Sequence, residues 1–173
     1  MSKLRTANLL GALSCAVSEL LVRQGKSHPN QTDSATAALN LIGFYDGCSN
    51  GALSKALDLS HTATVRLVDK LEAEGLVTSE PGIDRRSVSL RLTKAGRAHG
   101  RAAIQARCAA LCDVISALTP TQRAQLDGIA DTLLRSLVTT AGEADHICRL
   151  CDDTACPPKH CPVHQKGLSV AHS

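Results

Sequence analysis

Apolar residues recur every three or four positions along most of this chain, which is the spacing of amphipathic helices. One such stretch covers residues 3–22, and a second covers residues 32–45. Gly25 and Pro29 stand between them, and both residue types interrupt helices. The chain is therefore expected to begin with two separate helices.

The middle of the chain predicts two short helices and a β-hairpin. Residues 51–59 indicate a brief helix and a tight turn, after which Ser60 is suited to cap a longer helix that runs to about residue 74. Residues 76–78 and 87–92 have the composition of short strands, and the polar loop between them contains a Pro-Gly pair. Helix, short helix, turn, longer helix and hairpin is the order of a winged helix-turn-helix domain.

Two more helices are predicted after the hairpin. Apolar residues at helical spacing continue to residue 118, where Pro120 ends one helix and begins another that fades near Gly142. Apolar residues make up 43% of the chain and aromatic residues only 1%, so the core must consist of aliphatic side chains, which suits packed helices. The predicted fold class is mainly α with a small β-hairpin wing.

The longer helix of the middle segment has the features of a DNA-recognition helix. Helical periodicity directs Thr64, Leu67, Val68 and Leu71 towards the core and leaves the opposite face exposed. The start of such a helix offers hydroxyls and backbone N–H groups to a phosphate, and an arginine can pair with guanine through its planar donor groups. The residues expected to contact DNA on this helix are Ser60, His61, Thr62 and Arg66.

The tip of the predicted hairpin carries Arg85 and Arg86, where a wing reaches a minor groove or the DNA backbone. The alternative is that these basic residues are ordinary solvated side chains, the usual state of Lys and Arg. A net charge of +3 and a pI near 8.5 do not decide between the two. Single-stranded nucleic acid is disfavoured, because stacking needs aromatic residues and the chain has only Phe44 and Tyr45. The predicted partner is duplex DNA.

Residues 59–72 and 75–77, together with residues 83–86 and 90–96, resemble the recognition helix and wing of the multiple-antibiotic-resistance regulator (MarR) family. The resemblance covers roughly residues 3–142. It implies an obligate homodimer, with residues 3–25 and 97–142 as interlocking dimerisation helices and residues 31–96 as the winged helix-turn-helix domain. Two winged domains would then bind half-sites about one helical turn apart in a pseudo-palindromic operator.

Members of this family are often repressors that are released by a small ligand or by cysteine oxidation. The resemblance therefore implies a sequence-specific transcriptional regulator, a repressor, that responds to a small-molecule effector, a metal or a redox signal, and it does not imply an enzyme. Cys15 lies where peroxide-responsive relatives have a sensor thiol, but their tyrosines are missing, which favours a small buried residue instead. Cys108 and Cys112 lie on the predicted apolar stripe and are expected to pack in the core.

Composition changes abruptly near residue 142, and residues 143–173 form a separate tail rich in Cys and His, distinct from the main domain of residues 1–142. The tail has few large apolar side chains, so burial alone is not expected to order it. Cys148, Cys151, Cys156 and Cys161 can supply the four ligands of one tetrahedral zinc ion, with a Cys-x-x-Cys turn as the first half. The wider second pair also suits an iron–sulfur cluster, which is the lesser alternative.

Other interpretations of the tail stay open at this point. An imidazole of His146, His160 or His164 could replace one thiol as a ligand. The cysteines could instead form a disulfide-based redox element, which a reducing cytosol disfavours, or have no role in a disordered tail. The corresponding functions are a thiol redox protein, for which no βαβ unit is found around the Cys-x-x-Cys pair, and a metal-binding interaction module.

The N-terminus superficially resembles an export signal, because Lys3 and Arg5 precede a short apolar run that ends near Cys15. The helical spacing continues past Cys15, however, where a signal would already have been cleaved. No run approaches the ~18 consecutive apolar residues of a membrane span. A cytoplasmic protein without a membrane partner is expected.

Overall fold

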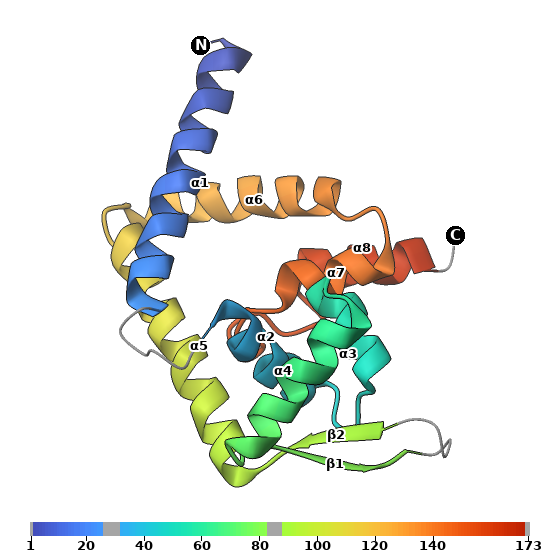
Figure 1. The fold of residues 1–173 in the computed structure, drawn as a ribbon. Coiled ribbons are helices and arrows are strands. Elements are labelled where there is room, and N and C mark those ends of the chain that lie inside the picture. The colour runs from blue at the N-terminus through green and yellow to red at the C-terminus, as the bar shows by residue number, and fades with distance from the viewer. Residues whose placement is uncertain (1, 26–31, 83–87, 172–173) are drawn as a thin grey trace.

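Helices form most of the structure, and a β-hairpin projects from the end that lies opposite α6 in Figure 1. The computed structural model describes residues 2–25, 32–82 and 88–171. Within these ranges the helices are α1 (Lys3–Gly25), α2 (Asp33–Phe44), α3 (Asn50–Leu57), α4 (His61–Ala73), α5 (Lys94–Ile115), α6 (Pro120–Leu137), α7 (Ala141–Cys148) and α8 (Pro162–Ala171). The strands are β1 (Val77–Pro81) and β2 (Val88–Leu92).

Serine and threonine side chains mark where the helices begin. At each start from α2 to α7, the hydroxyl oxygen of the N-cap residue accepts a hydrogen bond from a backbone N–H of the first turn. Each bond satisfies a helix N–H that has no partner within the helix, and it stabilises by about 1 kcal/mol. The predicted cap at Ser60 and the predicted helix start at Pro120 are confirmed. The six N-caps are Thr32, Ser49, Ser60, Thr93, Thr119 and Thr140.

Helices α2, α3 and α4 enclose one aliphatic core together with the hairpin. Leu39, Leu53 and Leu90, from three different elements, are each at most 2% exposed. Asp58 forms the tight turn between α3 and α4 in the left-handed conformation, with φ 54°, which a short polar side chain tolerates. Gly75, with φ 69°, follows the end of α4 and turns the chain into β1. The predicted winged helix-turn-helix fold is confirmed.

The two strands form the base of the wing. They pair antiparallel, with Val77 opposite Leu92 at the end nearest the core. The tip, residues 83–87, lies outside the described residues. The predicted DNA contacts at Arg85 and Arg86 therefore also lie outside them.

Helices α1, α5 and α6 extend beyond the winged core. Helix α5 packs against α2 and α1, whereas α1 projects away from the body and α6 crosses the top of the molecule in Figure 1. No residue of α6 is buried. Exposed large apolar side chains line both outer helices: Leu9, Leu10 and Leu13 on α1, and Leu126, Ile129, Leu133 and Leu137 on α6.

The cysteines on these long helices differ from expectation. Cys15 and Cys112 are exposed in the single chain, and Cys108 is half-buried. The predicted core burial is therefore wrong for Cys15 and Cys112 in one protomer. The reason is that α1 and the second half of α5 leave the core, so the apolar faces of these helices have no cover within one chain.

Among the described residues, no single helix combines the length and apolar character that crossing a membrane requires. Helices α5 and α6 meet that criterion only when they are taken together, as a pair bent by 120°.

The C-terminal tail folds back onto the winged domain as two helices and a connecting loop. Helix α7 packs against α8 and α3, and α8 also contacts α6. Val138, Ala144, Cys161 and Val163 form a small core there, each at most 8% exposed. The tail thus has a core that its composition does not predict. Helices α7 and α8 approach each other closely in this core. A Cβ at Gly167 on α8 would stand only 2.7 Å from the Cβ of Ala144 on α7, so small residues are needed at this contact.

Gly96 lies in the first turn of α5, where the chain has no room for a side chain. A Cβ at this position would lie 1.9 Å from the carbonyl oxygen of Leu76, and a backbone atom cannot move aside cheaply. We expect Gly96→Ala to lower the free energy of unfolding by about 2 kcal/mol or more. Urea denaturation followed by circular dichroism measures this change.

Gly51→Ala in α3 is the matched control for Gly96→Ala. A Cβ at Gly51 would meet its nearest atom, the Ser49 hydroxyl oxygen, at 3.8 Å, which is an ordinary contact. Alanine favours a helix over glycine by about 1 kcal/mol, so this variant should be as stable as the parent or more stable. An equal loss of unfolding free energy in both variants would contradict the tight contact at Gly96.

Candidate nucleic-acid interface and thiol cluster

Helix α4 has one buried and one exposed face. Thr64, Val68 and Leu71 are each at most 2% exposed, and Leu67 is half-buried against the same core. This orientation was predicted from helical spacing and is confirmed. DNA contact by the exposed face remains a prediction. The predicted contact residues on that face are His61, Thr62 and Arg66, and all three are exposed.

Ser60 has a structural role alongside its predicted contact with DNA. Its side-chain oxygen accepts a hydrogen bond from the Ala63 backbone N–H at 3.2 Å, and its carbonyl oxygen accepts one from the Thr64 hydroxyl at 3.1 Å. The hydroxyl of Ser60 can still donate its own hydrogen. A phosphate at the start of α4 would accept that hydrogen together with the unpaired backbone N–H groups of the first turn.

The basic residues near α4 differ in whether they already have partners. Lys70 pairs with a glutamate one turn later at 3.9 Å. Arg91 on β2 pairs with Asp46, just after α2, and with Glu80 on β1 at 3.1 Å, so it fixes the base of the wing against α2. Arg66 forms no ion pair with any described residue. It is therefore the basic side chain of α4 whose donors are available to DNA.

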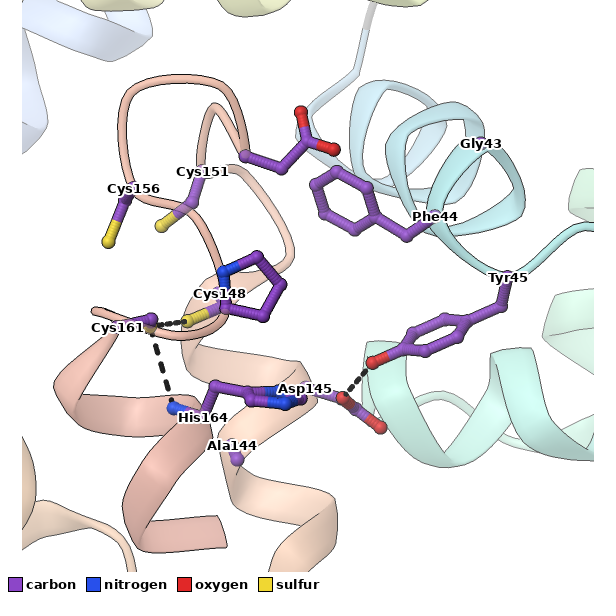
Figure 2. A pocket seen from close by; sticks show the side chains of 12 residues that line it. Gly43, Phe44, Tyr45, Ala144, Asp145, Cys148, Cys151, Cys156, Cys161 and His164 are labelled. Carbon is purple, nitrogen blue, oxygen red and sulfur yellow. Dashed lines mark hydrogen bonds between the residues drawn. The ribbon is translucent and has the colours of Figure 1, made fainter. Parts of the chain in front are cut away.

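The four predicted ligand cysteines of the tail converge on one place (Figure 2). Cys148 ends α7, Cys151 follows in a turn, and Cys161 immediately precedes α8. The sulfur atoms of Cys148 and Cys161 lie 3.8 Å apart. Cys148 also shares a hydrogen bond with Cys151, and Cys161 shares one with Cys156. The thiols therefore form a continuous chain of neighbours, which we call the thiol cluster.

The thiol cluster forms one wall of a cavity of about 250 Å³, and the end of α2 forms the opposite wall (Figure 2). The three histidines considered as ligands lie differently. His164 lines the cavity, whereas His146 directs its Nδ1 to the carbonyl oxygen of Ala56 at 3.1 Å and His160 is exposed. In the described ranges, no three side chains of Cys, His, Asp or Glu are arranged as ligands around one point. The sulfurs instead hydrogen-bond to one another as thiols.

The surroundings of the cluster shift the pKa values of Cys148, Cys151 and Cys156 differently. The hydrogen bond from Cys148, followed by the charges of Arg107 and Arg149, lowers the pKa of Cys151 to about 7, although burial opposes this shift. The same hydrogen bond, together with burial, raises the pKa of Cys148. Burial raises the pKa of Cys156 to about 11. Of these three thiols, Cys151 is therefore the one that most readily becomes a thiolate near neutral pH.

Polar contacts fasten the tail to the helix-turn-helix. The side-chain amide of Asn40 on α2 donates to the carbonyl oxygens of Arg149 and Cys151, at 3.1 and 2.9 Å. The Tyr45 hydroxyl donates to the carboxylate of Asp145 at 2.8 Å. We call these contacts, with the bond between His146 and α3, the tail tethers. They attach the turn that carries Cys148 and Cys151 directly to α2.

The residues of α2 that hold the tail were not predicted from the sequence. Asn40 could have been identified from the sequence as a residue that needs a hydrogen-bond partner, because it is a polar residue within the otherwise apolar stretch from Ala37 to Ile42. Nothing in the sequence marks Tyr45 or Asp145, since neither residue type is unusual at the end of a helix or in a polar tail. Their contact joins residues 100 positions apart.

A sequence model described as the MarR family matches residues 32–87, which span α2, α3, α4 and the hairpin. Residues 32–87 are thus similar to the MarR family, and the rest of the chain lies outside this match. No curated protein sequence matches the chain.

Solved structures of three other proteins have the same fold. A MarR family protein from Bacillus stearothermophilus aligns with a TM-score of 0.67 at 23% identity, over 79% of this chain and 97% of its own. Streptococcus pneumoniae FabT, in a complex with DNA, aligns with a TM-score of 0.66 at 20% identity, over 76% of this chain and 96% of its own. The apo form of wild-type E. coli MarR aligns with a TM-score of 0.64 at 23% identity, over 74% and 95%. Each neighbour is matched almost completely, while part of this chain has no counterpart.

The bond between Tyr45 and Asp145 can be tested by titration, because Tyr45 is the single tyrosine of a chain without tryptophan. Burial, and then the hydrogen bond to Asp145, raise the pKa of Tyr45 to about 12. The tether therefore contributes fully to folding below about pH 10 and loses its contribution as the pH rises through about 12. Asp145→Asn removes the negative charge and should move the ultraviolet titration midpoint towards the ordinary value.

Asp153→Asn is the control for this titration. Asp153 lines the same cavity but does not contribute to the raised pKa of Tyr45, so the midpoint should stay at that of the parent. An unchanged midpoint in Asp145→Asn would show that the tether does not form in solution.

Proposed function

We propose that this protein is a homodimeric, sequence-specific DNA-binding transcriptional regulator. One observation carries the proposal: the exposed N-terminal half of α4, with His61, Thr62 and Arg66, stands on a MarR-family winged helix-turn-helix. In this fold, that half of the recognition helix enters the major groove. The complex of FabT with DNA, a structure with the same fold, supports the assignment.

The proposed contacts divide into two kinds. Ser60 and Thr62 at the start of α4 bind a phosphate and set the register on the duplex, whereas Arg66 donates to a base edge. Arg85 and Arg86 in the wing contact the backbone or the minor groove beside the site. Base contacts give specificity, and phosphate contacts give affinity that depends on salt.

The proposed partner in the dimer is a second copy of this chain. The apolar stripe of α6 repeats at helical spacing, and one protomer leaves it uncovered. The exposed leucines of α1 offer the complementary face. Two copies joined in this way present two α4 helices to a pseudo-palindromic operator. A dimer bound across a promoter excludes the polymerase, so repression is the proposed direction.

The signal that releases the protein is proposed to act through the tail. The cavity of about 250 Å³ beside the thiol cluster is smaller than most ligand pockets, which span about 300–1,000 Å³. This size favours the thiols themselves over a large organic effector. Thiol redox chemistry at Cys148 and Cys151 is the second candidate function, supported by the lowered pKa of Cys151. Turnover in a disulfide-reductase assay would favour it over regulation.

Two arginine variants test the division between base and phosphate contacts. Arg66→Ala should reduce the ratio of operator to nonspecific affinity by about tenfold or more, because a base contact is lost. Arg85→Ala should weaken both affinities alike and make the salt dependence shallower by about one counterion. Fluorescence anisotropy with a selected operator over a range of salt measures both quantities. Lys159→Ala, in the tail loop, is the control, and equal losses of specificity in both arginine variants would contradict the proposed roles.

The dimer can be tested on the apolar stripe of α6. Ile129 is 58% exposed in one protomer, and Ile129→Glu should convert the dimer to a monomer by placing a charge in the interface. Arg135→Gln makes the same change in net charge away from the stripe and should stay dimeric. Analytical ultracentrifugation distinguishes the two states. A parent chain that sediments as a monomer would contradict the proposed dimer.

A further inference from the structure

We propose that Cys148, Cys151, Cys156 and Cys161 bind one zinc ion, and that the tail tethers transmit the metal state to the helix-turn-helix. The zinc site is proposed irrespective of what the protein does. The coupling to the helix-turn-helix rests on the proposed DNA-binding function.

One sulfur–sulfur distance in the cluster suits a shared ion, although the four thiols are not yet arranged around one point. A tetrahedral zinc ion with Zn–S bonds of about 2.3 Å holds its sulfurs about 3.8 Å from one another. The sulfurs of Cys148 and Cys161 already lie 3.8 Å apart. Each of these two sulfurs has one further thiol of the cluster beside it. A [4Fe–4S] cluster binds each cysteine to a different iron and therefore needs the four sulfurs farther apart.

Two backbone turns position the thiols, and Cys156 immediately precedes the second of them. In the first, the backbone N–H of Cys151 donates to the carbonyl oxygen of Cys148 at 2.9 Å. In the second, the backbone N–H of Cys161 donates to the carbonyl oxygen of Pro157 at 3.1 Å. A pair of short turns, each contributing two thiolates, is the usual construction of a four-cysteine zinc site.

The surroundings of the sulfurs suit thiolates. The backbone N–H of His164, in the first turn of α8, donates to the sulfur of Cys161 at 3.4 Å. A hydrogen bond of this kind to a ligand sulfur orients the metal ligand and stabilises its negative charge. Arg107 and Arg149 act electrostatically on Cys151, and Arg135 acts on Cys161. These three cations offset the double negative charge of a dication bound by four thiolates.

The binding step requires no change of redox state. Four S–H bonds break, up to four protons pass to solvent, and four S–Zn bonds form. The thiols already neighbour one another, and to bind the ion they must turn their sulfurs to one centre. Cys151 and Cys156 are exposed, so the ion has a path into the site.

The tethers connect this site to the element that would bind DNA. Asn40 holds the carbonyl oxygens of Arg149 and Cys151, which belong to the first metal-binding turn. The same helix packs against α3, and α3 packs against α4. Without the ion, the tail is held by its small core and by Leu150, which packs against the core of the winged domain, so its attachment to α2 should weaken. Loss of zinc would thereby change the position or rigidity of the helix-turn-helix.

Metal binding is tested first on the full-length parent chain. Protein purified without oxygen should contain one zinc per chain, and zinc should protect four of its eight cysteines from a thiol reagent. Cobalt should replace zinc and give the visible absorption of a tetrahedral thiolate site. Cobalt that binds without this absorption, a chain that takes up no zinc, or iron with cluster absorption would each overturn the zinc assignment.

Variants then locate the site. Cys148→Ser and Cys156→Ser should lose zinc by tenfold or more in affinity, whereas Cys15→Ser, on α1, should retain it. Circular dichroism of each variant shows whether the winged domain stays folded. Equal zinc binding by Cys148→Ser, Cys156→Ser and Cys15→Ser would place the ion elsewhere.

The coupling is tested by measuring operator affinity with zinc and after chelation. The Kd of the parent for the operator should differ by about fivefold or more between the two states. A fivefold change is at the lower end of ordinary allosteric coupling. Asn40→Ala should retain zinc but lose most of this dependence, and Asn40→Asp offers a second variant if the first unfolds. An unchanged parent Kd with zinc bound would overturn the coupling alone. A parent that binds zinc but no DNA would overturn the proposed function and with it the coupling, while the metal site would stand.

Discussion

The burial of helix α2 is the constraint on which the rest of the structure depends. Six of its twelve residues are buried, and it contacts α3, α5 and β2. Its C-terminal end also meets Arg91 through Asp46 and faces the thiol cluster. Burying this helix on several faces is favourable because its buried side chains are all alanine, leucine or isoleucine. A shift of α2 therefore moves the wing, the helix-turn-helix and the tail together.

Polar contacts on α2 have a different role from its apolar ones. The core leucines hold α2 in place irrespective of what happens in the tail, since they pack on α3, α4 and the hairpin. Asn40 and Tyr45 instead form hydrogen bonds with the tail. Such bonds contribute only about 1 kcal/mol each. A tether of that strength can be released by a change at the thiol cluster without unfolding the winged domain.

The outer helices α1 and α6 keep apolar surface exposed in a single chain. The apolar stripe of α6 and the leucines of α1 stay exposed, although similar side chains are buried wherever the fold provides a partner. Exposed apolar patches of this kind mark an interaction surface. The tail, by contrast, satisfies its own small core and sits against the winged domain of its own protomer. The signal proposed for the tail can therefore reach the α4 of its own chain directly.

The elements of this protein follow from local sequence. Helical spacing, the serine and threonine caps and the Pro-Gly loop predict the winged helix-turn-helix and the exposed face of α4, because neighbouring residues alone determine those features. The residue types and spacing of the four tail cysteines likewise suggest a common site. Only the tertiary structure decided that the tail folds back on α2, that Asn40 holds residues 109 and 111 positions away, and that Cys15 and Cys112 stay exposed. Those outcomes depend on which surfaces meet after the chain has folded, and no periodicity along the chain records that choice.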